Sequence, residues 1–262
     1  LKILESHLRT QLLLEQPYPK LRRRENLPYP NLKDINKMSN KTVIELENIN
    51  KIYQTGKNEL QVLFDICLQI YEGDFISIVG PSGSGKTTLL NIMACLDRPT
   101  SGRYILGGKN VKSKSKDDLS RLRNKSIGFI FQSFNLISRH TAIENVQMPL
   151  QYSNVVNKKE RAERALKCLE LVDLTNRAKH HPNELSGGQQ QRVAIARSLI
   201  NNPDIILADE PTGNLDSKTS ADIINLLKRL HESGKTIIII THDESIAKEA
   251  MDTIRIKDGR II

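Results

Sequence analysis

The fold is decided by the stretch Gly80-Pro81-Ser82-Gly83-Ser84-Gly85-Lys86-Thr87-Thr88. It has the pattern GxxxxGKT, and it lies between an apolar run at 75–79, typical of a buried strand, and a helical run at 89–95. Its glycines let backbone N–H groups turn inward at a helix N-terminus, where they form a concave site for an anion. Lys86 would reach the β- and γ-phosphates, and the Thr87 hydroxyl would bind Mg²⁺. The stretch predicts binding of a nucleoside triphosphate.

Apolar runs elsewhere indicate the fold class. Strands are expected at 75–79, 127–131, 205–208 and 236–240, with amphipathic helices between them. One helix would bury Ala162, Leu166, Leu169 and Val172, and another would bury Ile223, Leu226, Leu227 and Leu230. Fully apolar strands separated by helices are typical of a parallel sheet with both faces covered. Residues 43–49 and 62–70 alternate more and predict antiparallel strands, so we expect an α/β domain with a small β appendage.

Composition narrows the class of protein. The 262 residues are 38% hydrophobic and 26% charged, which excludes collagen-like, disulfide-framework and wholly disordered chains. No window approaches the roughly 18 consecutive apolar residues that a membrane-spanning helix needs. Three scattered cysteines favour a reducing cytosol. The net charge is +9, and residues 1–40 carry +4 of it.

The first 41 residues differ from the rest. Four prolines between positions 17 and 30 prevent a regular helix or a central strand there. We expect residues 1–41 to be a disordered extension that precedes one domain at 42–262. The alternative is a basic arm, centred on Arg22–Arg24, that binds lipid or a partner.

A second element supports nucleotide chemistry. The apolar strand at 205–208 ends in Asp209 and Glu210, and open α/β sheets bind ligands at the carboxyl ends of their strands. Asp209 is then placed to bind Mg²⁺, directly or through a water, and Glu210 to polarise an attacking water. The alternative is an ordinary strand end with solvated acids.

The residues Leu185-Ser186-Gly187-Gly188-Gln189 open a helical run at 190–200. Here the sequence resembles the ATP-binding cassette (ABC) family, whose signature is LSGGQ, over about 42–262. The resemblance implies a P-loop NTPase (RecA-like) core with an antiparallel β subdomain and an inserted α-helical subdomain at about 134–187. It also implies a head-to-tail dimer, in which Ser186–Gln189 of one copy bind the γ-phosphate of an ATP held by the other. The alternative is a capped helix without a ligand.

Further positions match the family one by one. Tyr53 matches the aromatic residue that stacks on adenine. The alternative interpretation is a half-buried tyrosine of a strand, without contact to a ligand. Gln132 matches the glutamine that contacts Mg²⁺ and the attacking water, and it begins the segment that touches the membrane domain. The resemblance places Asp216 in a loop that crosses the dimer interface, where Asn214 replaces the more usual alanine. His242 matches the histidine that contacts the γ-phosphate. Glu210, His242, Lys86 and Gln132 are therefore the expected catalytic residues.

Three longer strings are similar to one branch of the family, the MacB- and LolD-type ATPases. They lie at 95–102 (CLDRPTSG), 131–136 (FQSFNL) and 208–216 (ADEPTGNLD). This similarity implies a partner permease with few spanning helices, driven by ATP from the cytoplasmic side of a bacterial inner membrane. The sequence stops after a last strand and turn, so we expect a separate subunit, the alternative being that a fused membrane domain was removed. The alternatives are an ABC ATPase that acts on nucleic acid or ribosomes, which we do not expect as partners, and an FtsE-like cell-division regulator.

Overall fold

The computed structural model describes residues 41–262 except 57 and 153–156. The predicted extension, apart from Lys41, lies outside the described residues. The elements, in chain order, are β1 (Thr42–Thr55), β2 (Asn58–Tyr71), β3 (Phe75–Val79), α2 (Lys86–Met93), β4 (Ser101–Leu106), β5 (Lys109–Asn110), α3 (Lys116–Ser126), β6 (Ile127–Ile130), α4 (Ala142–Gln147), the 3-10 helix η1 (Met148–Tyr152), α5 (Lys158–Leu171), η2 (Thr175–Arg177), η3 (Pro182–Glu184), α6 (Gly187–Leu199), β7 (Ile205–Asp209), α7 (Ser217–Glu232), β8 (Thr236–Thr241), α8 (Glu244–Ala247), β9 (Asp252–Lys257) and β10 (Arg260–Ile261).

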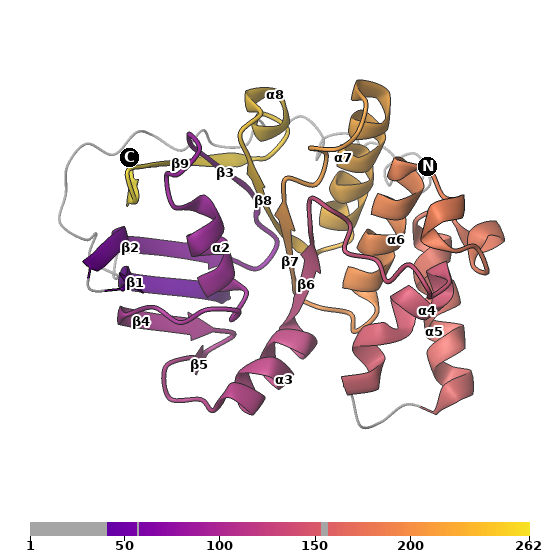
Figure 1. Cartoon of the computed structure of the whole chain (residues 1–262), viewed down its shortest axis with the longest axis horizontal. Coiled ribbons are helices and arrows are strands. Elements are labelled where there is room, and N and C mark those ends of the chain that lie inside the picture. The colour runs from indigo at the N-terminus through magenta and orange to yellow at the C-terminus, as the bar shows by residue number, and fades with distance from the viewer. Residues whose placement is uncertain (1–40, 57, 153–156) are drawn as a thin grey trace, which may run out of the picture. The chain divides into compact units, whose positions relative to one another are not determined.

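Two sheets organise these elements (Figure 1). The larger has the strand order β10-β9-β3-β8-β7-β6, and its strands are parallel except for β10, which pairs antiparallel with β9. The smaller sheet has the order β2-β1-β4-β5 and is antiparallel. Four predicted strands of the parallel sheet and both predicted antiparallel strands are present. The predicted α/β class is confirmed.

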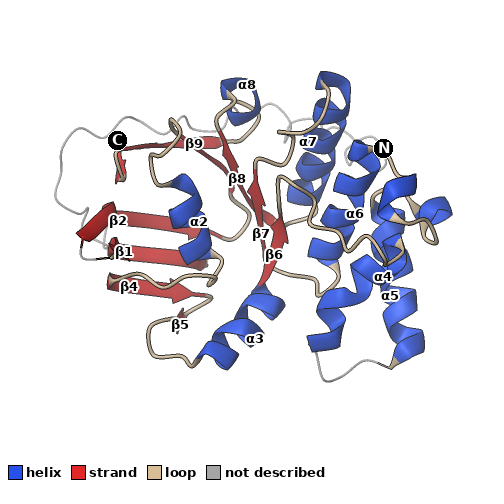
Figure 2. Ribbon diagram, in the orientation of Figure 1, coloured by secondary structure: helices blue, strands red, loops and turns tan. Residues whose placement is uncertain are grey.

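The parallel sheet has a core on each face. Along β8, Ile237 and Ile239 belong to a cluster with helices α4–α7, whereas Ile238 and Ile240 pack with β1, β2, α2 and α3. This alternation follows from the two-residue repeat of a strand. Figure 2 shows helices α4–α7 gathered on one side of the sheet and the antiparallel sheet with α2 on the other. The strands are therefore packed on both faces, and this fixes the points from which the loops after them start.

The predicted helical faces were correct for one helix and partly wrong for the other. Every apolar residue expected to be buried on α7 is buried. On α5, Leu166 is 39% exposed, while Ala165 and Cys168 are buried beside Leu169. The buried positions follow the spacing i, i+3, i+4 from Ala165, so the apolar stripe lies one position away from the one that Leu166 suggested.

Candidate active site

Register places the loops of the site at one edge of the parallel sheet. Val79, at the end of β3, pairs with Thr241 of β8, and Asp209, at the end of β7, pairs with Ile240. The residues that follow these three strands therefore emerge side by side, at the carboxyl ends where ligands bind in such sheets.

The loop between β3 and α2 is closely packed against residues of β9 and β2. A Cβ atom on Gly80 would lie 2.1 Å from the backbone oxygen of Ile256, and Gly85 has φ 98° with a Cβ position 2.8 Å from Leu63 Cδ2. Only glycine fits at these two positions. Helix α2 starts at Lys86 with no side-chain cap and no acidic residue in its first turn, which leaves its N–H groups available for an anion.

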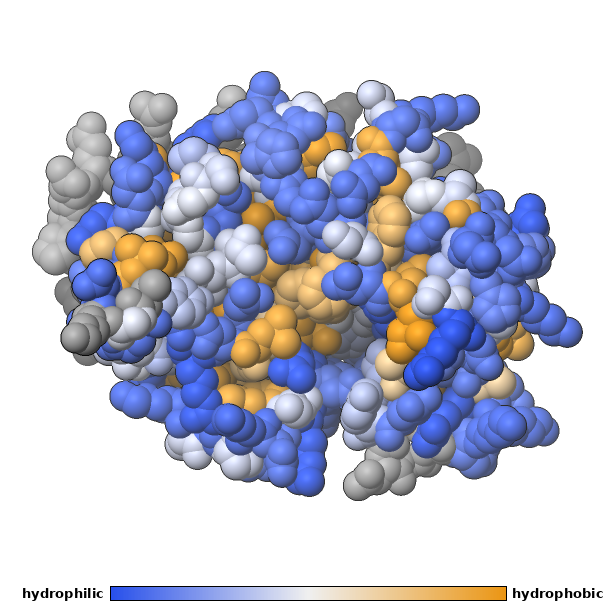
Figure 3. Space-filling view, viewed as in Figure 1, coloured by the Kyte–Doolittle hydropathy of each residue, from blue (hydrophilic) through white to orange (hydrophobic). Residues whose placement is uncertain are grey.

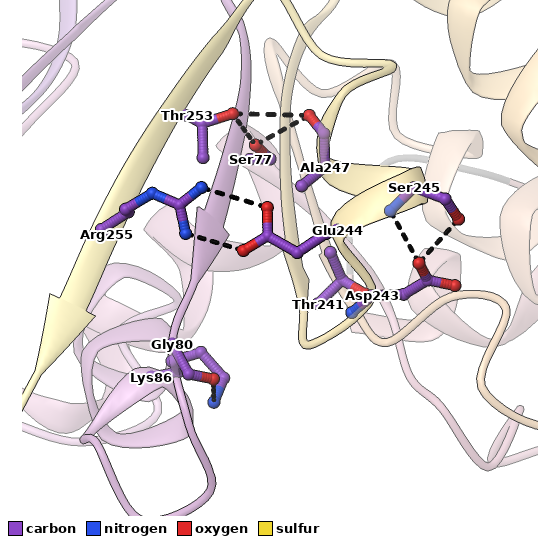
Figure 4. Close-up of polar contacts among 10 residues, drawn as sticks. All are labelled: Ser77, Gly80, Lys86, Thr241, Asp243, Glu244, Ser245, Ala247, Thr253 and Arg255. Carbon is purple, nitrogen blue, oxygen red and sulfur yellow. Dashed lines mark hydrogen bonds and ion pairs between the residues drawn. The ribbon is translucent and has the colours of Figure 1, made fainter.

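Two side chains of this loop have polar atoms suited to a bound phosphate. The Ser84 Oγ atom is buried, and no hydrogen-bond partner for it exists in the described part of the chain. The Lys86 side chain is buried too, and its Nζ donates to the backbone oxygen of Gly80 at 2.8 Å (Figure 4). It also donates to the backbone oxygen of Pro81 at 2.9 Å. Both of these acceptors are neutral carbonyls, so the buried ammonium group can also bind an anionic ligand.

The Glu210 carboxylate is held from the end of β8. Its Oε2 accepts from Thr241 Oγ1 at 3.1 Å, and its Oε1 accepts from the His242 backbone N–H at 2.9 Å. The His242 Nδ1 atom lies 2.6 Å from the same Oε1. Glu210 has a left-handed backbone, with φ 46°, and its side chain is only 14% exposed, against 70% for His242. The carboxylate is thus fixed, and the histidine ring faces solvent.

A cavity of about 380 Å³ brings most of the predicted site residues together. It is lined by Ser82, Gly83, Gly85, Lys86, Thr87, Thr88, Gln132, Asp209, Glu210 and His242, with Val62 and Ile240. Burial raises the pKa of Asp209, the adjacent Glu210 carboxylate raises it further, and Lys86 opposes both effects. Within the described residues, no group of three or more His, Cys, Asp or Glu side chains forms a metal site by itself.

Tyr53 lies beside this cavity rather than in its lining. Its hydroxyl donates to Asp97 Oδ2 at 2.8 Å, and Lys51 Nζ lies 4.6 Å from the centre of its ring. Lys51 also pairs with Asp97 at 2.7 Å. Burial is the main cause that raises the pKa of Tyr53, the bond to Asp97 adds to it, and a bond from Thr88 opposes it. The tyrosine is therefore fixed next to the phosphate loop.

The predicted signature residues lie apart from this cavity. Ser186 caps α6: its Oγ accepts from the Gln189 backbone N–H at 3.3 Å, and Gln189 Oε1 accepts from the Ser186 N–H at 3.0 Å. Asp216 likewise caps α7 through Thr219. In one chain, the predicted binding residues thus form two groups, one around the phosphate loop and one at the starts of α6 and α7.

Comparison with known proteins decides the family. Residues 63–213, more than half of the chain, match the family model described as ABC transporter. The chain belongs to this family. An uncharacterised ABC transporter ATP-binding protein of Thermotoga maritima is 51% identical over 221 residues, which are 84% of this chain and 94% of the relative. The macrolide export ATP-binding/permease protein MacB of Hyphomonas neptunium is 50% identical over 220 residues, but these are only 34% of that longer protein.

A solved structure of an ATP-binding cassette is similar to this chain. It is the ATP-binding cassette MJ0796, whose sequence is that of an ABC transporter ATP-binding protein of Methanocaldococcus jannaschii, as a post-hydrolysis dimer bound to ADP and Pi. It is 48% identical to this ABC protein, covers 83% of this chain and 96% of its own, and has a TM-score of 0.77. These likenesses confirm the P-loop NTPase fold, the ABC ATPase activity and the similarity to the MacB/LolD-type branch.

The sequence did not reveal two contacts of this cassette. Lys51 and Asp97 hold Tyr53 although they are 46 positions apart, so no local pattern links them. Thr241, the last residue of an apolar strand, binds Glu210, and only the register of β7 against β8 shows this. Among the described helices, none is both long and apolar enough to cross a membrane.

Proposed function

We propose that this ABC ATPase works as a homodimer that binds two Mg-ATP and drives a membrane permease from its cytoplasmic face. The observation that carries the proposal is the cavity in which Lys86 and Thr87 face Asp209, Glu210 and His242. Phosphate-binding and water-activating groups meet there, as phosphoryl transfer requires.

The phosphate loop supplies the binding part. The backbone N–H groups of 80–88 would hold the β- and γ-phosphates, with Lys86 exchanging its bonds to Gly80 and Pro81 for phosphate oxygens. Thr87 and Asp209 offer the hard oxygen ligands that Mg²⁺ prefers, and a site with so few protein ligands suits an ion that is shared with phosphates. Mg²⁺ would offset the negative charge on the triphosphate. We assign adenine stacking to Tyr53.

Three side chains are assigned to the chemistry. Glu210 would orient and polarise the attacking water, since its carboxylate is fixed by Thr241 and His242 and faces the cavity. His242, with its exposed ring, would contact the γ-phosphate, and Gln132 would contact Mg²⁺ and the water. Lys86 and the loop amides would stabilise the charge on the γ-phosphoryl oxygens as the bond to the leaving group breaks.

The second copy supplies what one chain lacks. Ser186–Gln189 do not line the cavity with the phosphate loop, so we assign them to the γ-phosphate of an ATP held by the partner copy. Asp216 belongs to the loop that would cross the interface. The dimeric structures of MJ0796 support this arrangement. Hydrolysis would break the clamp and open the dimer.

The permease is inferred from the relatives. MacB is named as an export ATP-binding/permease protein, and this chain matches a third of its length. We therefore propose a permease with few spanning helices in a bacterial inner membrane, with this chain peripheral on the cytoplasmic side. Nothing in the described residues favours the nucleic-acid alternative, and steep salt-dependent binding of DNA or RNA would be needed to revive it.

Two substitutions test the proposed ATP-driven dimer, which we call the motor. Glu210→Gln should bind ATP and accumulate as a dimer on size-exclusion chromatography with Mg-ATP, because closure occurs without turnover. Lys86→Ala should fail to bind ATP and stay monomeric. A Glu210→Gln protein that hydrolyses ATP at the wild-type rate would refute the role of Glu210.

The locked dimer then tests the partner. The Glu210→Gln protein is used with Mg-ATP to capture membrane proteins from detergent extracts, and Lys86→Ala is the matched control. A permease with few spanning helices and a large external domain supports the branch. A many-helix permease retained only by Glu210→Gln would refute the MacB/LolD-type partner, but it would still support an ATP-driven dimer that acts on a permease.

A further inference from the structure

The net charge of the domain is concentrated in one short segment. Residues 109–125, from β5 to near the end of α3, contain seven basic and two acidic residues. The remainder of 41–262 holds 24 basic and 24 acidic residues, and so is neutral. We call the seven side chains the basic surface: Lys109, Lys112, Lys114, Lys116, Arg121, Arg123 and Lys125.

These cations are not neutralised within the fold. Lys109, Lys112, Lys116 and Lys125 are exposed, and none forms an ion pair with another described residue. Arg121 comes only to 4.0 Å from Asp118, a neighbour on the same exposed helix. The segment therefore keeps an uncompensated positive field, strong at low salt and screened over about 10 Å at ordinary ionic strength.

Apolar side chains lie next to this charge. The Asn124 side chain donates to the Pro149 backbone oxygen at 3.2 Å and so joins α3 to η1, whose last residue, Tyr152, is 73% exposed. Arg123 donates to the Cys95 backbone oxygen, and the following residue, Leu96, is 49% exposed. Figure 3 shows hydrophilic side chains over α3 with apolar surface beside them.

We propose that the basic surface binds the anionic headgroups of the membrane that holds the permease. Lysines with an exposed tyrosine and leucine beside them match a bilayer interface, where the ammonium groups meet lipid phosphates and the apolar groups meet the headgroup boundary. The inference rests on the proposed function, which puts the chain next to a bilayer.

Nucleic acid fits the surface less well. Single-strand binders combine their charge with exposed aromatic rings on which bases stack, and Tyr152 is the one aromatic residue among the exposed large apolar side chains of the described chain. Acidic residues Asp117 and Asp118 also lie at the start of α3, on the same helix as four of the cations. A diffuse anionic plane of mobile headgroups tolerates them better than a fixed phosphate backbone does.

Flotation of the full chain with lipid vesicles tests the proposal. The wild-type protein is mixed with vesicles of phosphatidylcholine alone or with phosphatidylglycerol added. The test variant replaces Lys109, Lys112, Lys116 and Lys125 by Gln, and the control variant replaces Lys167, Lys179, Lys248 and Lys257, also exposed, by Gln. Both variants lose the same charge, and both keep the basic residues of 1–40.

We expect the wild type and the control to float with anionic vesicles only, and to be released by salt. The test variant should bind at least about tenfold more weakly, since each lysine at an anionic bilayer adds roughly fivefold to affinity. Equal binding by the two variants, or no preference for phosphatidylglycerol, overturns the proposal. So does binding of duplex DNA or RNA that depends on the four lysines while vesicles remain unbound.

ATP turnover and thermal melting are measured on the same proteins. Both should be unchanged in the two variants, because none of the replaced lysines lies in the nucleotide cavity. If the protein does not float with vesicles but still dimerises with ATP, lipid binding by the basic surface is rejected and the proposed ATP-driven dimer is not affected. Failure of the Glu210→Gln dimer would reject the motor whatever the vesicles show.

Discussion

The Asn214 side chain donates a hydrogen bond of 3.0 Å from its Nδ2 atom to the backbone oxygen of Gln132. It thus joins the loop before α7 to the segment after β6. The preceding Gly213 permits the approach, since a Cβ atom there would lie 2.8 Å from Gln132 Nε2. An alanine at position 214 could not make this bond.

The same segment is held from the signature helix. Arg197 of α6 donates to the backbone oxygens of Phe134 at 2.8 Å and Asn135 at 2.5 Å. Both of these residues have left-handed backbones, with φ 57° and 50°. Burial lowers the pKa of Arg197, yet it forms no ion pair with a carboxylate in the described chain. The loop before α7, the segment after β6 and helix α6 are therefore connected within one chain.

Asn214→Asp tests this connection. The aspartate has the same shape but cannot donate, and it places a negative charge against the Gln132 carbonyl, at a cost of about 1–3 kcal/mol. We expect ATP binding to the monomer to be unchanged and ATP turnover to fall by about tenfold. The assays are nucleotide affinity and steady-state ATPase rate, with Asn214→Ala as the milder control. Wild-type turnover in the aspartate variant would contradict the prediction.

Ser186 allows capping to be separated from nucleotide contact. Ser186→Asp keeps a good cap for α6, whereas Ser186→Ala loses one worth about 1 kcal/mol. We expect the aspartate variant to melt like the wild type but to form no ATP-dependent dimer in the Glu210→Gln background, because its charge would face the γ-phosphate. The alanine variant should melt a few °C lower and still dimerise. Dimerisation of the aspartate variant would show that Ser186 only caps the helix.

Asp209→Asn should stabilise the nucleotide-free protein while abolishing Mg²⁺-dependent hydrolysis. Burial and the Glu210 carboxylate raise the pKa of Asp209, so its charged form costs stability near neutral pH. The gain in Tm should be about 2 °C, since the carboxyl is only partly buried and solvent screens its charge. The gain should shrink as the pH falls through the raised pKa, where the wild-type carboxyl is protonated. Differential scanning calorimetry over pH checks this, and a lower Tm at neutral pH would refute it.

Asp97→Asn should weaken ATP binding without slowing chemistry. It removes the charge that holds Lys51 and Tyr53 together, although the tyrosine ring itself remains. We expect KM for ATP to rise by about tenfold, or about 1.4 kcal/mol, with kcat unchanged. Tyr53→Phe, which keeps the ring and loses the hydroxyl, is the control and should change KM less. A fall in kcat at constant KM would place Asp97 in a different role.

Local patterns predicted the parts of this fold that are continuous in the chain. Strand β3 has the bounds that its apolar run predicted, and β6, β7 and β8 differ from prediction by one residue, because strands buried on both faces read as unbroken apolar runs. The phosphate loop could also be predicted from a local pattern, because all the residues of the motif lie in one continuous stretch at 80–88. The bounds of the helical subdomain stay a prediction.

Contacts between distant segments were beyond such patterns. The bond between Asn214 and Gln132 spans 82 positions, and nothing in either local sequence specifies the other partner. Leu166 was misplaced for a related reason: a stripe at helical spacing does not show which of two adjacent faces meets the neighbouring helix. Only the packing of α5 against α4 and α6 decides between them.

The turn between β9 and β10 is hydrogen-bonded directly to the phosphate loop. The Gly259 backbone N–H donates to the Ser84 oxygen at 3.0 Å, and its own oxygen accepts from Phe64 of β2 at 2.9 Å. Arg255 of β9 forms a two-pronged ion pair with Glu244 of α8 (Figure 4), and Glu244 lies two residues after His242. A displacement of this hairpin would therefore move both the phosphate loop, through Ser84, and the segment around His242, through Glu244. A molecule that binds the hairpin would in this way change the affinity for nucleotide.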